Sequence, residues 1–565
     1  SLKDVFLIDD NLNVKYISTN GKEYGDNLNN KVLEDETEIR FSSKAFSEYV
    51  SKISGVTEDE MKFKWMKNQT KLEIADTSVD SLQDLVFFPN LTSLTLGEYG
   101  TNIPPITSMD GIENCTKLEK LSILFGEVKD YKSISKLNNL TSFYRYAGTD
   151  YKEIMDVLKD CSNIQDVSII NQKISDMSEV SKLHNLKSLD LNYNNINKIT
   201  GLENLYNLET LKLENNLITQ VTGLENLINL KKLILTNNKI TDITPLSANT
   251  SLTLLELKGN SGIDGNRANY TSEKLKELNK IGEILDRGGI INVDVDKLAL
   301  FTNYRSLDLT SQELSTLEML KGITDLKYLN LSDNKLTLED IKSQEILKNM
   351  TNLNELNLNA NYITNITAIN NLKNLKKLSI LGSNNAINLA EIEDIISNLS
   401  IFRVSGEDLK TIKNCNIEKI TCLNLDTSGL KEIPDLSMFT KLKRLNLAYN
   451  SNVSNFDEIS KIPSIQVLNL GSNKLHNRMI DFSQLTNLTN LILSSNTLWS
   501  EDLESLKSLK NNINLTIDLS DNSIIDASAL LELNSNTKIN LRNNVNLSQD
   551  SKDKLKEKFG NNVQF

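Results

Sequence analysis

Residues 186–199 read LKSLDLNYNNINKI, and this stretch decides the fold of the chain. Its pattern, L-x-x-L-x-L-x-x-N-x-I-x-x-I, starts again at Leu208, Leu230 and Leu252, so each step is 22 residues long. A fixed period of about 20–30 residues is typical of a solenoid, in which each repeat packs only on its neighbours. The sequence therefore predicts a long series of stacked coils.

Each repeat contains a strand segment and a return segment. The segment L-x-x-L-x-L alternates as a β-strand does, so we expect its leucines to point inward and its x residues to face solvent. The rest of each repeat is expected to return as short 3₁₀ or helical turns. The asparagine after each strand segment is expected to bond the main chain of adjacent coils. These asparagines are Asn194, Asn216, Asn238, Asn334, Asn361, Asn450, Asn473, Asn496 and Asn522.

Helical caps are expected at both ends, because an open sheet edge invites aggregation. Residues 1–40 are polar and predict a small hairpin or a loose lead-in. The sequence Thr57-Glu58-Asp59-Glu60 has the form of a capping box, which predicts the start of a helix. A preceding helix is indicated by the spacing of Phe46, Tyr49, Val50 and Ile53. A C-terminal helix over residues 551–559 and its extension are expected to cover the last coil with Leu555, Phe559, Val563 and Phe565.

An inserted helix is expected to interrupt the array between Gly259 and Gly289. The apolar residues at helical spacing there are Leu275, Leu278, Ile281 and Leu285. A shortened coil follows, because Val293 and Leu309 are only 16 residues apart. The predicted parts are a lead-in and helical cap (1–66), a first array (67–260), the insertion and shortened coil (261–303), a second array (304–548) and a C-terminal cap (549–565).

Composition restricts the class of partner. The 565-residue chain has a net charge of −13, which argues against nucleic-acid binding, since that needs a basic surface. No apolar run approaches about 20 residues, so we expect no membrane span. With only four cysteines (Cys115, Cys161, Cys415 and Cys422), the fold is not a disulfide scaffold.

The repeats resemble a known class. Residues 202–208 (LENLYNL) and 224–230 (LENLINL) look like internalin-type leucine-rich repeats, and residues 57–96 resemble the lead-in of bacterial surface proteins of that class. The fold class is accordingly predicted as an α/β solenoid, a leucine-rich repeat horseshoe or arc with a concave parallel β-sheet and about 21 coils. The resemblance implies a secreted or wall-attached bacterial protein that grips a partner with its concave sheet.

The x positions of the strands are the candidate binding residues. Long basic side chains lie at Lys187, Lys231, Lys232, Arg305, Lys327, Lys376, Lys377, Lys443 and Arg444. Such a basic stripe fits an acidic partner surface. The alternative is an ordinary solvated face balanced by Asp190, Glu209, Glu256, Asp308 and Glu355. Aromatic anchors are expected at Tyr193, Tyr328 and Tyr449, since tyrosine is enriched in binding hot spots.

The segment Phe143-Tyr144-Arg145-Tyr146, followed by Tyr151, departs from the repeat. Arg145 stands where the third leucine of the strand segment belongs. Because an arginine enters a dry core only at high cost, we expect this coil to distort or to expose Arg145. One interpretation is a ligand-contacting site at Tyr144, Arg145, Tyr146 and Tyr151; the other is a degenerate coil whose tyrosines fill the core.

The sequence favours recognition over catalysis. The two histidines, His184 and His476, are nearly 300 residues apart, and we identify no catalytic triad, zinc motif or phosphate loop. We therefore expect a non-enzymatic monomer without a cofactor, secreted or on a bacterial cell surface, which binds a protein or glycan on another surface. The alternatives are an intracellular scaffold or regulatory subunit, and a structural spacer on the cell surface.

Overall fold

The computed structural model describes the backbone of residues 4–8, 14–19 and 22–24, and all of residues 35–36, 38–75, 78–98, 106–124, 128–383, 386–413 and 415–565. The chain divides into two compact units, unit 1 (Ser1–Phe301) and unit 2 (Thr302–Phe565).

Unit 1 begins with a small antiparallel sheet and a helical segment. The sheet contains β1 (Asp4–Ile8), β2 (Val14–Thr19) and β3 (Lys22–Tyr24). The helical segment contains α1 (Lys44–Ser54), the 3₁₀ turn η1 (Glu58–Glu60) and α2 (Phe63–Lys67). The expected capping box at residues 57–60 is wrong. The Thr57 hydroxyl donates to the Glu60 carboxylate at 3.1 Å instead of capping the backbone, and only one 3₁₀ turn forms.

The rest of unit 1 is a solenoid with one parallel sheet. Its ten described strands neighbour one another in chain order: β4 (Lys71–Ile74), β5 (Ser93–Leu96), β6 (Lys120–Ile123), β7 (Ser142–Tyr146), β8 (Asp166–Ile170), β9 (Ser188–Asp190), β10 (Thr210–Lys212), β11 (Lys232–Ile234), β12 (Leu254–Glu256) and β13 (Ile290–Asn292). Equivalent leucines pair across the strands, as Leu189, Leu211, Leu233 and Leu255 do.

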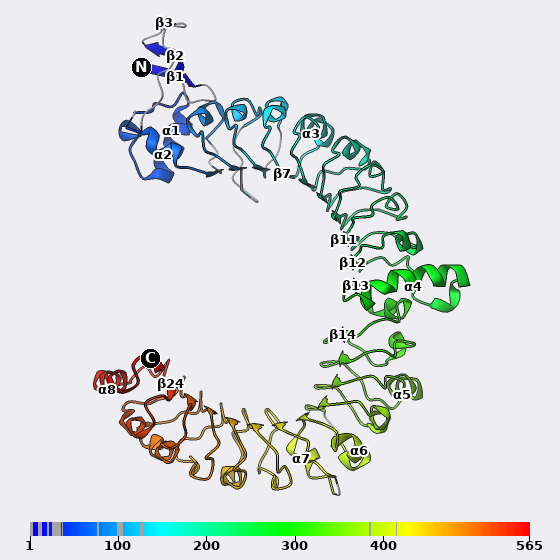
Figure 1. Cartoon of the computed structure of the whole chain (residues 1–565), viewed down its shortest axis with the longest axis vertical. Helices are drawn as coiled ribbons and strands as arrows, with labels where there is room; N and C mark the ends of the chain where they lie inside the picture. The colour runs from blue at the N-terminus through cyan, green and yellow to red at the C-terminus, as the bar shows by residue number, and fades with distance from the viewer. Residues whose placement is uncertain are drawn as a thin grey trace. The chain divides into compact units, whose positions relative to one another are not determined.

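The return segments of unit 1 are mostly single 3₁₀ turns. These are η2 (Gln83–Phe87), η3 (Ile112–Asn114), η4 (Lys132–Lys136), η5 (Ser178–Lys182), η6 (Thr244–Ala248), η7 (Arg267–Asn269) and η8 (Val295–Leu300), with α-helices α3 (Tyr151–Leu158) and α4 (Ser272–Asp286). The strands line the concave side of unit 1, and α3 and α4 lie on its convex side (Figure 1). Helix α4 is the expected insertion; the Thr271 hydroxyl caps it by accepting from the Lys274 N–H at 3.3 Å.

Unit 2 is a second solenoid of the same design. Its twelve described strands also follow chain order: β14 (Ser306–Asp308), β15 (Tyr328–Asn330), β16 (Glu355–Asn357), β17 (Lys377–Ser379), β18 (Ile401–Arg403), β19 (Cys422–Asn424), β20 (Arg444–Asn446), β21 (Val467–Asn469), β22 (Asn490–Ile492), β23 (Thr516–Asp518), β24 (Lys538–Asn540) and β25 (Val563–Gln564). A concave parallel sheet with short return segments confirms the predicted solenoid class in each unit.

The return side of unit 2 holds both helix types. The α-helices are α5 (Ile341–Lys348), α6 (Glu393–Ile396), α7 (Gly406–Leu409) and α8 (Gln549–Phe559). The 3₁₀ turns are η9 (Glu318–Leu320), η10 (Thr367–Asn371), η11 (Leu389–Ile392), η12 (Phe456–Lys461), η13 (Ser500–Leu509), η14 (Ser528–Glu532) and η15 (Gly560–Asn562). After α8 the chain adds β25 to the sheet edge, which buries Val563 but leaves Phe565 41% exposed, so Phe565 does not cover the last coil as expected.

The leucines of the strand segments form the core. Leu211, Leu213 and Leu233 are fully buried, and most of their equivalents in the other coils are also buried. Full burial of one leucine side chain contributes about 1.5–3 kcal/mol, so a few such side chains per coil supply most of its stability. None of the described helices combines the length and hydropathy needed to cross a bilayer.

The repeated asparagines join consecutive coils, as predicted. Asn216 accepts a hydrogen bond from the Ile196 N–H at 3.0 Å and donates to the carbonyls of Leu191 at 3.0 Å and Leu213 at 3.1 Å. Ile196 and Leu191 belong to the preceding coil, so one buried side chain satisfies backbone groups of both coils. Two further asparagines that the sequence analysis did not include, Asn260 and Asn544, make equivalent bonds.

We expect Leu211→Asp to destabilise unit 1 by at least about 3 kcal/mol, because it places a carboxylate between coils where no cation can pair with it. Urea unfolding followed by circular dichroism measures this effect. Thr210→Asp is the matched control, since Thr210 is the outward neighbour in the same strand, and its unfolding midpoint should stay close to that of the unmodified chain. An unchanged midpoint in Leu211→Asp would contradict the inward assignment.

We expect Asn216→Ala to cost about 2–3 kcal/mol, because the Ile196 N–H and the Leu191 carbonyl lose their buried partner. Hydrogen exchange of the Ile196 amide should accelerate together with a loss of urea resistance. Asn195→Ala, at the exposed position that follows Asn194, is the control for loss of an amide side chain. Equal effects of the two substitutions would show that the bonds between coils contribute little.

Candidate functional site

The concave face of each unit is the candidate site. Strand register aligns its outward residues into columns that run from coil to coil. In unit 1, the residue at the centre of each strand segment forms a column that includes Tyr144, Ser168, Asp190, Lys212 and Ile234. Neighbouring strands lie about 4.8 Å apart, so each column presents one side chain at that interval to a partner.

Four predicted residues lie on the concave side of unit 1. Lys187, Lys231 and Lys232 are exposed, and Tyr193, three residues after the end of β9, is 55% exposed with a left-handed backbone (φ 57°). Lys231 pairs with the Glu209 carboxylate at 2.7 Å, and this hydrogen bond lowers the pKa of Glu209. Lys231 is therefore locally balanced, whereas Tyr193 offers a large ring to a partner.

Two other predicted site residues are corrected by the structure. Arg145 is fully buried, and its coil neither expels it nor breaks the strand, because β7 continues through Tyr146. Its guanidinium donates from Nη2 to Asp150 at 2.8 Å and from Nε to the Tyr131 hydroxyl at 3.1 Å. Tyr151 is only 8% exposed and donates its hydroxyl to the Met177 carbonyl at 2.8 Å. Arg145 and Tyr151 are thus core residues.

A glycine makes room for this buried ion pair. A Cβ atom at Gly148, whose φ is +116°, would lie 2.6 Å from Nη2 of Arg145. The Tyr131 hydroxyl donates in turn to the same Asp150 carboxylate, and burial raises the pKa of Tyr131. Tyr144 and Tyr146 are half-buried on either side of Arg145, so only their outer parts can meet a ligand.

The first coils of unit 2 carry three predicted residues. Arg305 is exposed 3.4 Å from Asp325, and Lys327 is exposed beside it in the next coil. Tyr328 is half-buried in β15 between Ser306 and Glu355, and burial raises its pKa. The alternative of a charge-balanced face therefore fits Arg305, as it fits Lys231.

The middle coils of unit 2 carry the remaining predicted residues. Lys376 and Lys377 lie on or beside β17, Lys443 and Arg444 on or beside β20, and all four are exposed. Lys377 pairs with Glu355 at 3.1 Å. Tyr449 follows β20 with 64% of its surface exposed and a φ of 59°.

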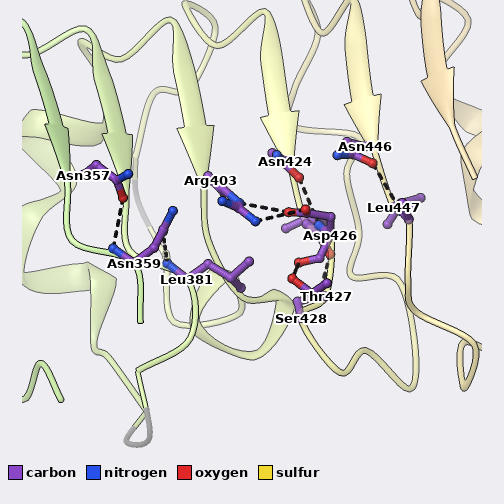
Figure 2. Close-up of polar contacts among 12 residues, drawn as sticks. Asn357, Asn359, Leu381, Arg403, Asn424, Asp426, Thr427, Ser428, Asn446 and Leu447 are labelled. Atoms are coloured by element: carbon purple, nitrogen blue, oxygen red, sulfur yellow. Dashed lines mark hydrogen bonds and ion pairs between the residues drawn. The ribbon is translucent and has the colours of Figure 1, made fainter. Parts of the chain in front are cut away.

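Asparagines aligned across the strands of unit 2 form a column that was not predicted from the sequence. Residues Asn357, Asn424, Asn446 and Asn469 occupy the centre of L-N-L triplets, and the recurrence of this triplet is the signal that could have revealed them. Each Oδ1 accepts the backbone N–H two residues later, at 3.1 Å in Asn357 and 3.0 Å in Asn424. Figure 2 shows Asn357, Arg403, Asn424 and Asn446 at the ends of neighbouring strands, with Arg403 pointing to Asp426.

That ion pair is bidentate. Arg403 donates to the Asp426 carboxylate from Nε at 2.9 Å and from a terminal nitrogen at 3.0 Å, the bidentate geometry that suits arginine. Both charges are thus satisfied inside the protein, and Arg403 contributes little net charge to a partner.

The described residues also bear on catalysis. Within the described ranges, no group of three or more His, Cys, Asp and Glu side chains is placed to hold a metal ion. His476 bonds the buried Asp502 at 2.8 Å and stacks on Trp499, with 4.6 Å between ring centroids. Asp502 and Trp499 belong to the next coil, so these contacts of His476 join two neighbouring coils. All four cysteines are free, so Cys415 and Cys422 form no bridge.

Comparisons with known proteins agree on the type of repeat. Residues 184–226 match the family model described as Leucine Rich repeats (2 copies). The match covers two repeats of unit 1, and unit 2 has the same consecutive parallel strands. A comparison with curated protein sequences gives no match.

Solved structures similar to the chain come from bacteria and mouse. An internalin from Listeria monocytogenes is 21% identical, with 88% of this chain and 95% of that chain covered and a TM-score of 0.28. The mouse RP105/MD-1 complex is 19% identical, with 84% and 91% covered and a TM-score of 0.49. A leucine-rich repeat protein of Leptospira interrogans is 20% identical, with 81% and 97% covered and a TM-score of 0.32.

We expect Arg145→Leu to destabilise unit 1 by about 3–5 kcal/mol although it restores the consensus leucine, because the Asp150 carboxylate, only 12% exposed, loses its cation. The double variant Arg145→Leu/Asp150→Ser should recover at least half of the loss, since it removes both charges. Urea unfolding of the single and double variants completes the cycle. A neutral effect of Arg145→Leu alone would show that Asp150 does not need its cation.

Proposed function

We propose that this chain is a non-enzymatic recognition protein, secreted by or displayed on a bacterium, that binds a protein or glycan on another surface through a concave sheet face. The solenoid supports this proposal because its sheet is an extended, rigid array of outward side chains with short spacing. Function in such a fold depends on the side chains of that array, since the fold itself is shared by unrelated functions.

The observation that carries the proposal is the exposure of concave tyrosines. Tyr193 in unit 1 and Tyr449 in unit 2 are 55% and 64% exposed, and each is held by a left-handed backbone at the end of a strand. Rings left largely in water at ordered positions are typical of binding hot spots, where a partner buries them. The same left-handed conformation recurs at the equivalent positions of neighbouring coils, such as Asn215 and Asn237, so it is a feature of the turn that follows each strand.

The extracellular part of the proposal rests on the internalin-type repeat at residues 202–208 and 224–230. Protease shaving of intact source cells tests it. Release of peptides of this chain without lysis supports an outside location. Complete protection until lysis, with the protein expressed, would overturn that location and favour the intracellular scaffold.

We expect the purified chain to bind selectively to members of an array of folded extracellular proteins and glycans, and Tyr193→Ser or Tyr449→Ser to weaken that binding about 30-fold, as loss of a hot-spot tyrosine does. Biolayer interferometry on the selected partner measures the change. The matched control is Tyr206→Ser: Tyr206 is 51% exposed but lies on the return segment, away from the strands.

An equal loss in Tyr206→Ser would show that the return side binds. Binding that survives both concave substitutions, and also the combined replacement of Tyr144, Tyr146 and Tyr328, would contradict the concave site.

A further inference from the structure

Two cation pairs stand out on the concave face of unit 2. Lys376 and Lys377 form the first pair, and Lys443 and Arg444 form the second. Within the described part of the chain, Lys376, Lys443 and Arg444 form no ion pair with a carboxylate. Only Lys377 has such a partner, Glu355. In a chain with a net charge of −13, this is a local excess of positive charge.

The strands between the pairs set their separation. Register aligns Lys377 with Ile401, Ile401 with Cys422, and Cys422 with Arg444, on four consecutive strands, β17 to β20. Three strand spacings are about 14 Å. The two residues in between, Ile401 and Cys422, are half-buried, and burial raises the pKa of the Cys422 thiol, which stays neutral. The column therefore contains, in order, a cation, an apolar side chain, an uncharged thiol and a second cation.

The adjacent column adds hydrogen-bond donors. Asn424, Asn446 and Asn469 each use Oδ1 to accept a backbone N–H, at 3.0, 3.1 and 3.0 Å. Within the described residues their amide nitrogens donate to no protein group, so these nitrogens are available to a partner. Figure 2 shows Asn424 and Asn446 at the ends of adjacent strands. The carboxylates of Glu355 and Asp426 on this face already pair with Lys377 and Arg403. The remaining lysine, arginine and amide nitrogens are donors, and they fit a partner rich in acceptors and negative charge.

We propose that this face of unit 2 binds an extended, acidic polypeptide segment of the form acidic–x–apolar–x–acidic, which runs across strands β17 to β20. The proposal rests on the recognition function proposed above and names the chemical class of its partner. The two acidic side chains pair with the two cation pairs, and the apolar side chain packs on Ile401 and Cys422.

The dimensions of an extended chain agree with this placement. Residues i and i+4 of a strand are about 13 Å apart and point to the same side, as the two cation pairs require. Residue i+2 then lies about 7 Å from residue i, which places it between strands β18 and β19, over the space between Ile401 and Cys422. Carbonyl groups on one edge of the segment face the amide nitrogens of Asn424 and Asn446.

The apolar centre favours a polypeptide over an anionic polysaccharide. A polysaccharide would leave Ile401 and Cys422 without an apolar partner, and it gains nothing from their position between the cations. A peptide offers carboxylates and an aliphatic side chain in one segment. A second copy of this chain is disfavoured as a whole partner by the shared net charge of −13.

The test is fluorescence anisotropy of the full chain with the capped, labelled peptide Ser-Glu-Thr-Val-Thr-Glu-Ser. We expect saturable binding in low salt that Lys376→Ser/Lys443→Ser/Arg444→Ser weakens at least about tenfold, since each exposed pair contributes a few-fold. The matched control is Lys187→Ser/Lys231→Ser/Lys232→Ser, which removes three exposed concave cations of unit 1 and should change affinity less than twofold.

Peptide variants separate spacing from charge. Ser-Glu-Glu-Thr-Val-Thr-Ser carries the same charge with adjacent acids, and we expect it to bind at least about fivefold more weakly, because it reaches only one cation pair. Equal binding of both peptides, no binding of the first, or an equal loss in the unit 1 control would overturn the proposal. Tighter binding of a heparin octasaccharide that depends on the same three cations would overturn it in favour of an anionic polysaccharide.

The array experiment distinguishes this failure from a failure of the proposed function. A partner lost in Tyr193→Ser but retained in the Lys376/Lys443/Arg444 variant would leave the recognition function standing and overturn the peptide site. Unfolding curves of both triple variants should overlay that of the unmodified chain, since all six side chains are exposed.

Discussion

The structure depends on the buried asparagine that ends each strand segment. A coil that turns away from the sheet leaves N–H and carbonyl groups without strand partners, and these groups are buried between coils. Asn216 satisfies three of them, one by accepting and two by donating, and Asn238 repeats the arrangement one coil later. Because each asparagine bonds to the coil before it, the same hydrogen bonds fix both the geometry of the turn and the stacking of consecutive coils.

The concave face is a consequence of that constraint. Once the coils stack in register, every outward residue of a strand belongs to a column with a spacing of about 4.8 Å. Side chains that are 21 or more residues apart in sequence thus become neighbours, as Lys377, Ile401, Cys422 and Arg444 do. Each column therefore combines residue types that no local stretch of the sequence brings together.

One coil shows how the same frame accommodates an exception. Arg145 can be buried because Asp150 neutralises its charge and the Tyr131 hydroxyl accepts a hydrogen bond from its Nε. Gly148, which has no side chain, leaves room for the guanidinium. The cost of burying the charge could be predicted from the sequence, but the positions of its partners, Asp150 and Tyr131, could not. The burial of Tyr151 was missed for the same reason, since its hydroxyl donates to the Met177 carbonyl in the next coil, after β8.

The sequence alone determined the solenoid, the inward leucines, the structural asparagines and the inserted helix at residues 272–286, because the spacing of side chains along one chain is a local property. It also predicted cations and tyrosines on or beside the strands. Only the tertiary structure decided which cations are balanced, as Lys231 is by Glu209, and which are not, as with Lys443. It also fixed the free amide nitrogens of Asn424 and Asn446. Those properties depend on register between coils, and register is set by packing in three dimensions.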